Sequence, residues 1–169
     1  MSALARAWAA VVDGLLAAAG LVFAAVTLLI AWDVVARNLG LEPPASTVAL
    51  TEYALLYACL AAGPALVRRR GHVTVDVLVE RLPPPARRWA GRGVLLASAA
   101  TAFAIAGLAL ALAVEAVARG EVDVRSLDIP RVWLFAPLVA GFGLMGLECL
   151  RLVARGEAPS RPPGDRESL

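Results

Sequence analysis

The sequence predicts an all-α integral membrane protein with four transmembrane helices and a short amphipathic interfacial helix between the second and the third. Hydrophobic residues make up 60% of the 169 residues, whereas soluble domains contain about 45–50%. They gather in four runs of about 20 residues, the length that a helix needs to cross about 30 Å of hydrocarbon. Most charged residues lie between these runs, as the low polarity of a lipid core requires.

The first predicted span covers residues 13–35 and follows a short amphipathic lead-in. Its apolar run is too long for a signal peptide and lacks a small-residue cleavage site, so we expect it to be retained. The second predicted span covers residues 45–67 and contains one charge, Glu52, near its outer end. Pro64 lies inside this run and should kink the helix unless neighbouring groups compensate for the lost backbone hydrogen bond.

The connector between the second and third spans, residues 68–92, holds seven arginines and cannot enter lipid. Four apolar residues at i, i+3, i+4 and i+7, from Val75 to Leu82, predict about two turns of amphipathic helix lying flat among the lipid headgroups. The arginines are expected to stop the second span and to attract anionic lipid. The candidates for headgroup contact and for setting the topology are Arg68, Arg69, Arg70, Arg87 and Arg88.

The third and fourth predicted spans cover residues 93–114 and 131–153. The third is rich in alanine, and small residues let helices approach closely where lipid removes the hydrophobic drive. The fourth contains Pro137 and several glycines. Residues 1–153 are therefore expected to form one four-helix membrane domain. Residues 154–169, with proline, glycine and mixed charge, are expected to form a disordered cytoplasmic tail.

The distribution of arginine predicts the orientation of the chain. An even number of spans places both termini on the same side as the connector, and that side carries twelve arginines against four on the other. Cytoplasmic loops are enriched in basic residues, so we expect both termini in the cytoplasm. Tryptophans near the predicted span ends agree with an aromatic belt at the membrane interface. They are Trp8, Trp32, Trp89 and Trp133.

The sequence offers no catalytic or cofactor-binding constellation. The chain has one histidine, and Cys59 and Cys149 lie inside apolar runs without metal-ligand spacing. It contains no serine–histidine–acid set, phosphate-binding glycine loop or nucleophile elbow. The arginines flank apolar segments instead of lining one soluble face, which argues against nucleic-acid binding. We expect no catalytic, metal, substrate or cofactor site on this chain.

Charged groups near the span ends have expected partners. Asp33 and Arg37 lie four residues apart on one helical face and can pair at the interface. Glu52, an acid inside a span, is a candidate for transport chemistry, but its place near the outer interface favours pairing with Arg37 or with a group of a partner subunit. Glu148 lies near a span end and is expected to reach water in a cytoplasmic charge cluster. The other members of that cluster are Arg151 and Arg155.

Several short motifs occur in order between residues 15 and 152. The connector contains the pattern R-x-G-H-x-x-V-D, in which Arg69, Gly71, His72, Val75 and Asp76 match. The other motifs are Arg37-Asn38-Leu39-Gly40 after the first span, Thr51-Glu52-Tyr53 in the second, and Ile129-Pro130-Arg131-Val132-Trp133 at the start of the fourth. Together they resemble the small permease (DctQ-like) subunit family of tripartite ATP-independent periplasmic (TRAP) transporters. The departures are Asn38, where the family usually has an aromatic residue, and the triple proline.

The resemblance implies an accessory role in transport. In that family the small subunit binds a larger membrane subunit, which carries the substrate and sodium sites, and a periplasmic binding protein delivers an organic anion. This chain is therefore expected to brace the large permease subunit in the bacterial inner membrane and to help dock the binding protein for ion-driven uptake of an organic acid. The candidates for partner contact or scaffolding are Arg37, Glu52, Arg69, Gly71, His72, Asp76, Pro130, Trp133 and Pro137.

Two other interpretations stay open at this stage. A self-sufficient four-helix transporter would oligomerise around Glu52. A membrane enzyme or redox subunit would need ligands or acid–base pairs within its spans, which the sequence lacks. His72 has no second imidazole to share a metal, so we expect it to have a structural role at the turn into the amphipathic helix.

Overall fold

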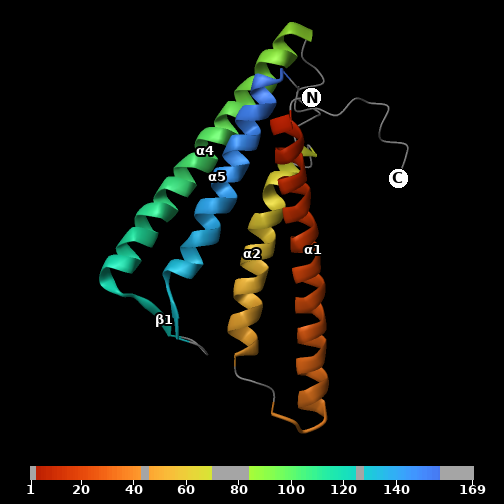
Figure 1. The fold of residues 1–169 in the computed structure, drawn as a ribbon, viewed down its shortest axis with the longest axis vertical. Coiled ribbons are helices and arrows are strands. Elements are labelled where there is room, and N and C mark those ends of the chain that lie inside the picture. Colours follow the sequence, from red (N-terminus) through yellow and green to blue (C-terminus); the bar gives the residue numbers. More distant parts are fainter. Residues whose placement is uncertain (1–2, 43–45, 70–83, 125–127, 157–169) are drawn as a thin grey trace, which may run out of the picture.

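The computed structural model describes residues 3–42, 46–69, 84–124 and 128–156, which form four long helices and one β-hairpin (Figure 1). The elements are α1 (Ala3–Asn38), α2 (Thr47–Arg68), α4 (Pro84–Arg119), β1 (Val122–Val124), β2 (Asp128–Pro130) and α5 (Val132–Ala154). Each helix is long and apolar enough to cross a membrane, so the predicted four-helix membrane fold is confirmed. The predicted amphipathic helix at residues 75–82 and residues 157–169 of the predicted tail lie outside the described residues.

Two of the helices extend beyond the predicted spans. α1 contains 36 residues, because the lead-in and the first span form one continuous helix. α4 also contains 36 residues and begins at Pro84, so residues 84–92 of the predicted connector belong to this helix. α2 and α5 contain 22 and 23 residues, close to the predicted lengths. At 1.5 Å per residue, α1 and α4 are about 54 Å long, and α2 and α5 about 33–35 Å.

The described helices form an open row. Extensive contacts join α1 to α2, α2 to α5, and α5 to α4, so α1 and α4 are the outer members of the row (Figure 1). Buried residues of α2, α4 and α5 meet in a small core near the end where α1 begins and α5 ends. These residues are Val67, Leu95, Ala99, Cys149 and Leu152. Large apolar side chains stay exposed on every helix, as Leu21 of α1 and Leu108 of α4 illustrate.

Alanine forms most of the buried stripe of α4. Its buried hydrophobic residues alternate at intervals of four and three, and they are Leu95, Ala99, Ala102, Ala106, Ala109, Ala113 and Ala116. The average period of 3.5 residues keeps one stripe against a partner when two helices wind around each other with a left-handed twist. α5 is the principal neighbour of α4, so this stripe forms the α4–α5 contact. Alanine loses no rotamer freedom on packing, which favours close approach.

Two glycines set the distance between α5 and its neighbours. A Cβ added at Gly141 would lie 2.7 Å from the Cβ of Leu60 in α2 and 3.1 Å from the Leu60 carbonyl oxygen. Pro64 lacks the N–H that would bond to this oxygen in a regular helix, and α2 nevertheless continues through Pro64. A Cβ added at Gly146 would lie 2.9 Å from the Phe103 ring in α4. Both positions therefore bring α5 closer to its neighbour than any other residue would allow.

A β-hairpin joins α4 to α5 at the opposite end of the molecule (Figure 1). Val122, Asp123 and Val124 pair in antiparallel register with Pro130, Ile129 and Asp128. These strands are not apparent in the sequence, because each has only three residues and so too short a pattern of alternating side chains to recognise. The hairpin is therefore an addition to the predicted helical fold.

Candidate functional site

Interacting side chains gather at the two ends of the helix row. The Glu148 cluster, at the end where α1 begins, comprises Trp8, Asp13, Arg68, Glu148 and Arg151. The hairpin cluster, at the other end, comprises Tyr53, Tyr57, Glu121, Asp123 and Arg131. Each cluster joins residues that are far apart in the sequence.

Glu148 is the most completely buried charged residue of the described chain, with 1% of its surface exposed. The Trp8 indole N–H donates a hydrogen bond to Glu148 Oε2, and Arg151 Nη1 lies 3.3 Å from the same oxygen. The Arg151 guanidinium also lies over the Trp8 ring, 6.0 Å from its centroid, at the limit of a cation–π contact. Desolvation of a carboxylate costs several kcal/mol, and the two donors offset this cost.

The burial of Glu148 corrects the sequence prediction. The carboxylate was expected to reach water as part of a surface cluster with Arg151 and Arg155, but α1 covers it and supplies Trp8 as a donor. The placement of Trp8 in the interfacial belt stays a prediction, and the structure adds that Trp8 fastens α1 to α5. Its partner lies 140 residues away, so local spacing could not find the contact. An acidic residue in an apolar run was the available signal, since such residues are almost always paired.

Arg68 fastens the same part of α1 to α2. Its Nη1 donates to the Ala9 carbonyl oxygen at 3.2 Å, and its Nη2 pairs with the Asp13 carboxylate. The predicted role of Arg68 is headgroup contact and topology, and the structure adds this contact within the chain. The first turns of α1 are therefore fixed from both α2 and α5.

The hairpin cluster joins the α1–α2 pair to the α4–α5 pair at the end where their ribbons diverge in Figure 1. The Tyr57 hydroxyl donates to the Trp133 carbonyl oxygen at 2.9 Å, and the Tyr53 hydroxyl donates to Asp123 Oδ2 at 3.2 Å. Both tyrosines belong to α2, and their acceptors belong to α5 and β1. Long side chains therefore connect α2 to the other pair at this end, whereas Gly141 permits direct contact nearer the middle.

An ion pair anchors the hairpin to the start of α5. Arg131 Nη1 lies 2.8 Å from Glu121 Oε2, and the Arg131 backbone N–H donates to the Glu121 carbonyl oxygen at 3.0 Å. Arg119 Nη1 lies 3.9 Å from the other oxygen of the same carboxylate. Because the Arg131 side chain is 49% exposed, this pair adds little stability by itself, and the backbone bond fixes the geometry.

The structure describes several of the predicted partner and scaffold residues. Arg37 Nε lies 2.8 Å from Asp33 Oδ2, as their spacing predicted, and the pairing of Arg37 with Glu52 stays a prediction. Glu52 is exposed on α2. Pro130 pairs with Val122 in the hairpin. Two further predicted partner residues belong to α5: Trp133 is 55% exposed, and Pro137 is buried.

The predicted connector residues are only partly described. Arg69 is exposed and directly follows the last residue of α2, and its N–H donates to the Ala65 carbonyl oxygen at 2.9 Å. Arg87 and Arg88 lie in the helical backbone of α4. The remaining candidates, Arg70, Gly71, His72 and Asp76, lie outside the described residues.

The described side chains offer contacts between helices and no reactive constellation. Within residues 3–42, 46–69, 84–124 and 128–156, no group of three His, Cys, Asp or Glu side chains is placed to hold a metal ion. Cys59 is exposed on α2 and Cys149 is buried in α5. This arrangement can hold helices at fixed positions and can present surfaces to other molecules.

Comparison with known proteins finds one family. The sequence model described as "Tripartite ATP-independent periplasmic transporters, DctQ component" matches residues 26–158, which include the end of α1 from residue 26 onward and all of α2, α4 and α5. No curated protein and no solved structure gives a match.

Proposed function

Because this chain belongs to the DctQ family of TRAP transporter components, we propose that it braces a larger permease subunit and helps to dock a periplasmic binding protein. It is a multi-pass small membrane subunit of a transporter family, and that family is not an enzyme family. The family match over residues 26–158 carries the proposal. The transported substrate would be an organic acid, taken up into the cell by symport with an ion.

The exposed apolar surface supports a bracing role. Only 11% of the residues in the most apolar window of α1 are buried inside the chain, and the share reaches 28% in α2 and α5. An open row of helices has two broad faces, so one face can meet lipid while the other packs against a larger subunit. The Glu148 cluster and the hairpin cluster would hold the row rigid while that subunit moves substrate.

Transport by the isolated chain is the first test. We expect vesicles with this chain alone to show no substrate-driven sodium or proton flux, because no substrate or ion site is predicted on it. Vesicles that also contain the large subunit and the binding protein should take up substrate, and omission of this chain should abolish that uptake. Flux through the chain alone would favour the self-sufficient transporter built around Glu52.

The proposed orientation places both termini in the cytoplasm of a bacterial cell, with the hairpin in the periplasm. In a chain carrying Cys59→Ala and Cys149→Ala, we expect Val124→Cys to react with a membrane-impermeant maleimide in intact spheroplasts. Arg6→Cys, in the first turns of α1 and therefore at the opposite end of the molecule from the hairpin, should react only after permeabilisation. Both side chains are exposed, so a reversed pattern would show that the orientation is inverted.

The hairpin is the proposed docking element for the binding protein. Val124 is 79% exposed and Val122 is 46% exposed, and exposed apolar groups on an anchored strand suit a protein contact. We expect Val124→Asp to raise the binding-protein concentration needed for half-maximal uptake by about tenfold, the effect of losing about 1.4 kcal/mol. Yield of the complex between the two membrane subunits should stay unchanged.

Leu41→Asp is the matched control for this prediction. Leu41 is 54% exposed in the connection between α1 and α2, at the same end of the molecule as the hairpin. We expect this variant to need the same binding-protein concentration as the parent. Equal effects of the two aspartates would mean that charge at this end, and not the hairpin, controls docking.

A further inference from the structure

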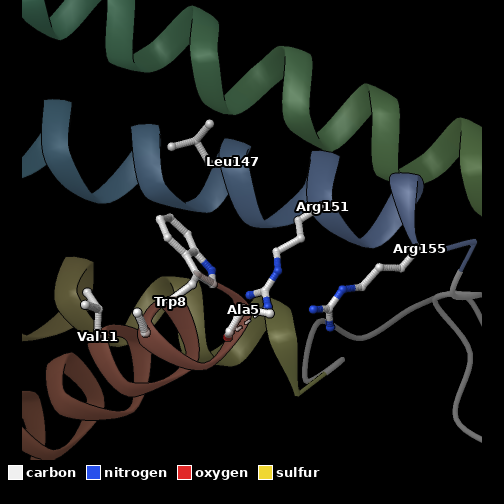
Figure 2. Close-up of a pocket in the computed structure, with 7 residues that line it drawn as sticks. Ala5, Trp8, Val11, Leu147, Arg151 and Arg155 are labelled. Carbon is white, nitrogen blue, oxygen red and sulfur yellow. Dashed lines mark hydrogen bonds between the residues drawn. The ribbon is translucent and has the colours of Figure 1, made fainter. Parts of the chain in front are cut away.

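A groove runs between the first turns of α1 and the last turns of α5 (Figure 2). Its volume is about 650 Å³, within the range of about 300–1,000 Å³ that is common for small-molecule sites. The residues that line this α1–α5 groove are Ala5, Ala7, Trp8, Val11, Leu147, Arg151 and Arg155.

Apolar and charged groups are separated along the groove. In Figure 2, Val11 and Leu147 lie toward one end, and the Arg151 and Arg155 side chains project from α5 toward the other. Arg155 directly follows the last residue of α5, so the charged end lies at the membrane surface. Leu147 lies one to two turns deeper, about 6–12 Å along the helix. Polarity therefore changes along the bilayer normal.

We infer that the α1–α5 groove binds an anionic phospholipid, with its phosphate at Arg151 and Arg155 and an acyl chain along Val11 and Leu147. A phospholipid in the same leaflet has its charged and apolar parts in this order. Guanidinium groups match phosphate through paired N–H donors. Among the lining residues, two carry positive charge and none carries negative charge, so an anionic headgroup is preferred over a neutral one.

Contacts within the Glu148 cluster hold Arg151, one of the two arginines of this groove, in position. Arg151 is 20% exposed, and its side chain contacts Glu148 and also the Ala5 carbonyl oxygen at 3.4 Å. These contacts hold the guanidinium at the edge of the groove before any lipid arrives, which lowers the entropy lost on binding. The inference concerns a site on this chain alone and does not depend on the proposed partners.

Lipid titration of the purified full-length chain tests the inference. Native mass spectrometry would count bound dioleoyl-phosphatidylglycerol and dioleoyl-phosphatidylcholine in separate titrations. We expect the parent to bind phosphatidylglycerol at least about fivefold more tightly, the preference expected from one arginine near a membrane surface. Arg155→Gln should remove most of this preference, and Ala7→Phe, which fills the groove, should weaken the binding of both lipids.

Arg119→Gln is the control, because Arg119 is an exposed arginine at the opposite end of α4. We expect it to bind both lipids as the parent does, and monodisperse elution would show that every variant is folded. Equal losses in Arg119→Gln and Arg155→Gln, an unaffected Ala7→Phe variant, or no preference for phosphatidylglycerol would each overturn the inference. A large gain in affinity on neutralising Glu157, Asp165 and Glu167 in the full chain would identify the tail as the occupant instead.

Discussion

Glu148→Ala is expected to lower the free energy of unfolding in detergent by about 3 kcal/mol and to release the start of α1 from α5. The substitution removes a buried carboxylate and leaves the Trp8 N–H and the Arg151 guanidinium without their acceptor. Breaking a buried charged pair costs about 3–5 kcal/mol. Arg151 is 20% exposed and regains some water, which places the cost at the low end. Thermal and denaturant unfolding in one detergent would measure it.

Two variants separate this contact from a general effect of charge. Trp8→Phe and Glu148→Ala, alone and combined, form a double-mutant cycle, and we expect a coupling energy of about 1.5–3 kcal/mol for a hydrogen bond to a charged group. Glu115→Ala is the matched control, because Glu115 is 48% exposed and pairs with Arg119 at 2.5 Å. We expect it to change stability by less than about 0.5 kcal/mol. A coupling energy near zero would show that Trp8 and Glu148 do not stabilise one another.

Gly141→Ala is expected to lower the free energy of unfolding by about 1–3 kcal/mol. Its new Cβ would meet both the Leu60 Cβ and the Leu60 carbonyl oxygen, at 2.7 and 3.1 Å. The carbonyl belongs to the backbone and cannot rotate away, so α2 and α5 must separate. Unfolding measurements would give the loss, and reduced yield of the complex with the large subunit would show whether the helix row is needed for assembly.

Two neighbouring glycines provide the controls for Gly141. Apart from the adjacent residues and the local backbone of α5, no atom lies within 4 Å of a Cβ added at Gly143, so Gly143→Ala should be neutral or stabilising by up to about 1 kcal/mol through helix propensity. A Cβ at Gly63 would meet the Met145 side chain at 2.6 Å, and this flexible side chain can move. We therefore expect the loss of unfolding free energy on substitution with alanine to be smallest at Gly143, larger at Gly63 and largest at Gly141. A cost at Gly143 equal to that at Gly141 would contradict the proposed close approach.

The predicted features that the structure confirms are those that depend on local sequence. Length and uncharged composition were enough to predict four membrane helices, and spacing alone predicted the Asp33–Arg37 pair. The starts of α1 at Ala3 and of α4 at Pro84 were not predicted, because the lead-in and the last part of the connector were treated as segments separate from the membrane spans. Helix boundaries are the least certain part of such predictions.

Contacts between distant segments were not predictable in the same way. The stripe of α4 that includes Ala99, Ala102 and Ala106 is buried, but Ala97, Ala100 and Ala104 show similar spacing on another face. Because alanine is frequent on both faces, composition does not show which face is buried. The buried face is determined by the position of α5. The contact between Glu148 and Trp8 was not predictable for a similar reason, because it depends on where α1 lies against α5.

The unequal helix lengths have a consequence for the surrounding bilayer. α2 and α5, at about 33–35 Å, nearly match a hydrocarbon core of about 30 Å, whereas α1 and α4, at about 54 Å, exceed it by more than 20 Å. Only the apolar part of this excess is hydrophobic mismatch, which is relieved by tilting or by local thickening of the membrane, whereas the arginine-containing first turns of α4, residues 84–92, stay outside the hydrocarbon. The inner helices are therefore matched to the membrane thickness, and the flanking helices must tilt or project into water on either side of it.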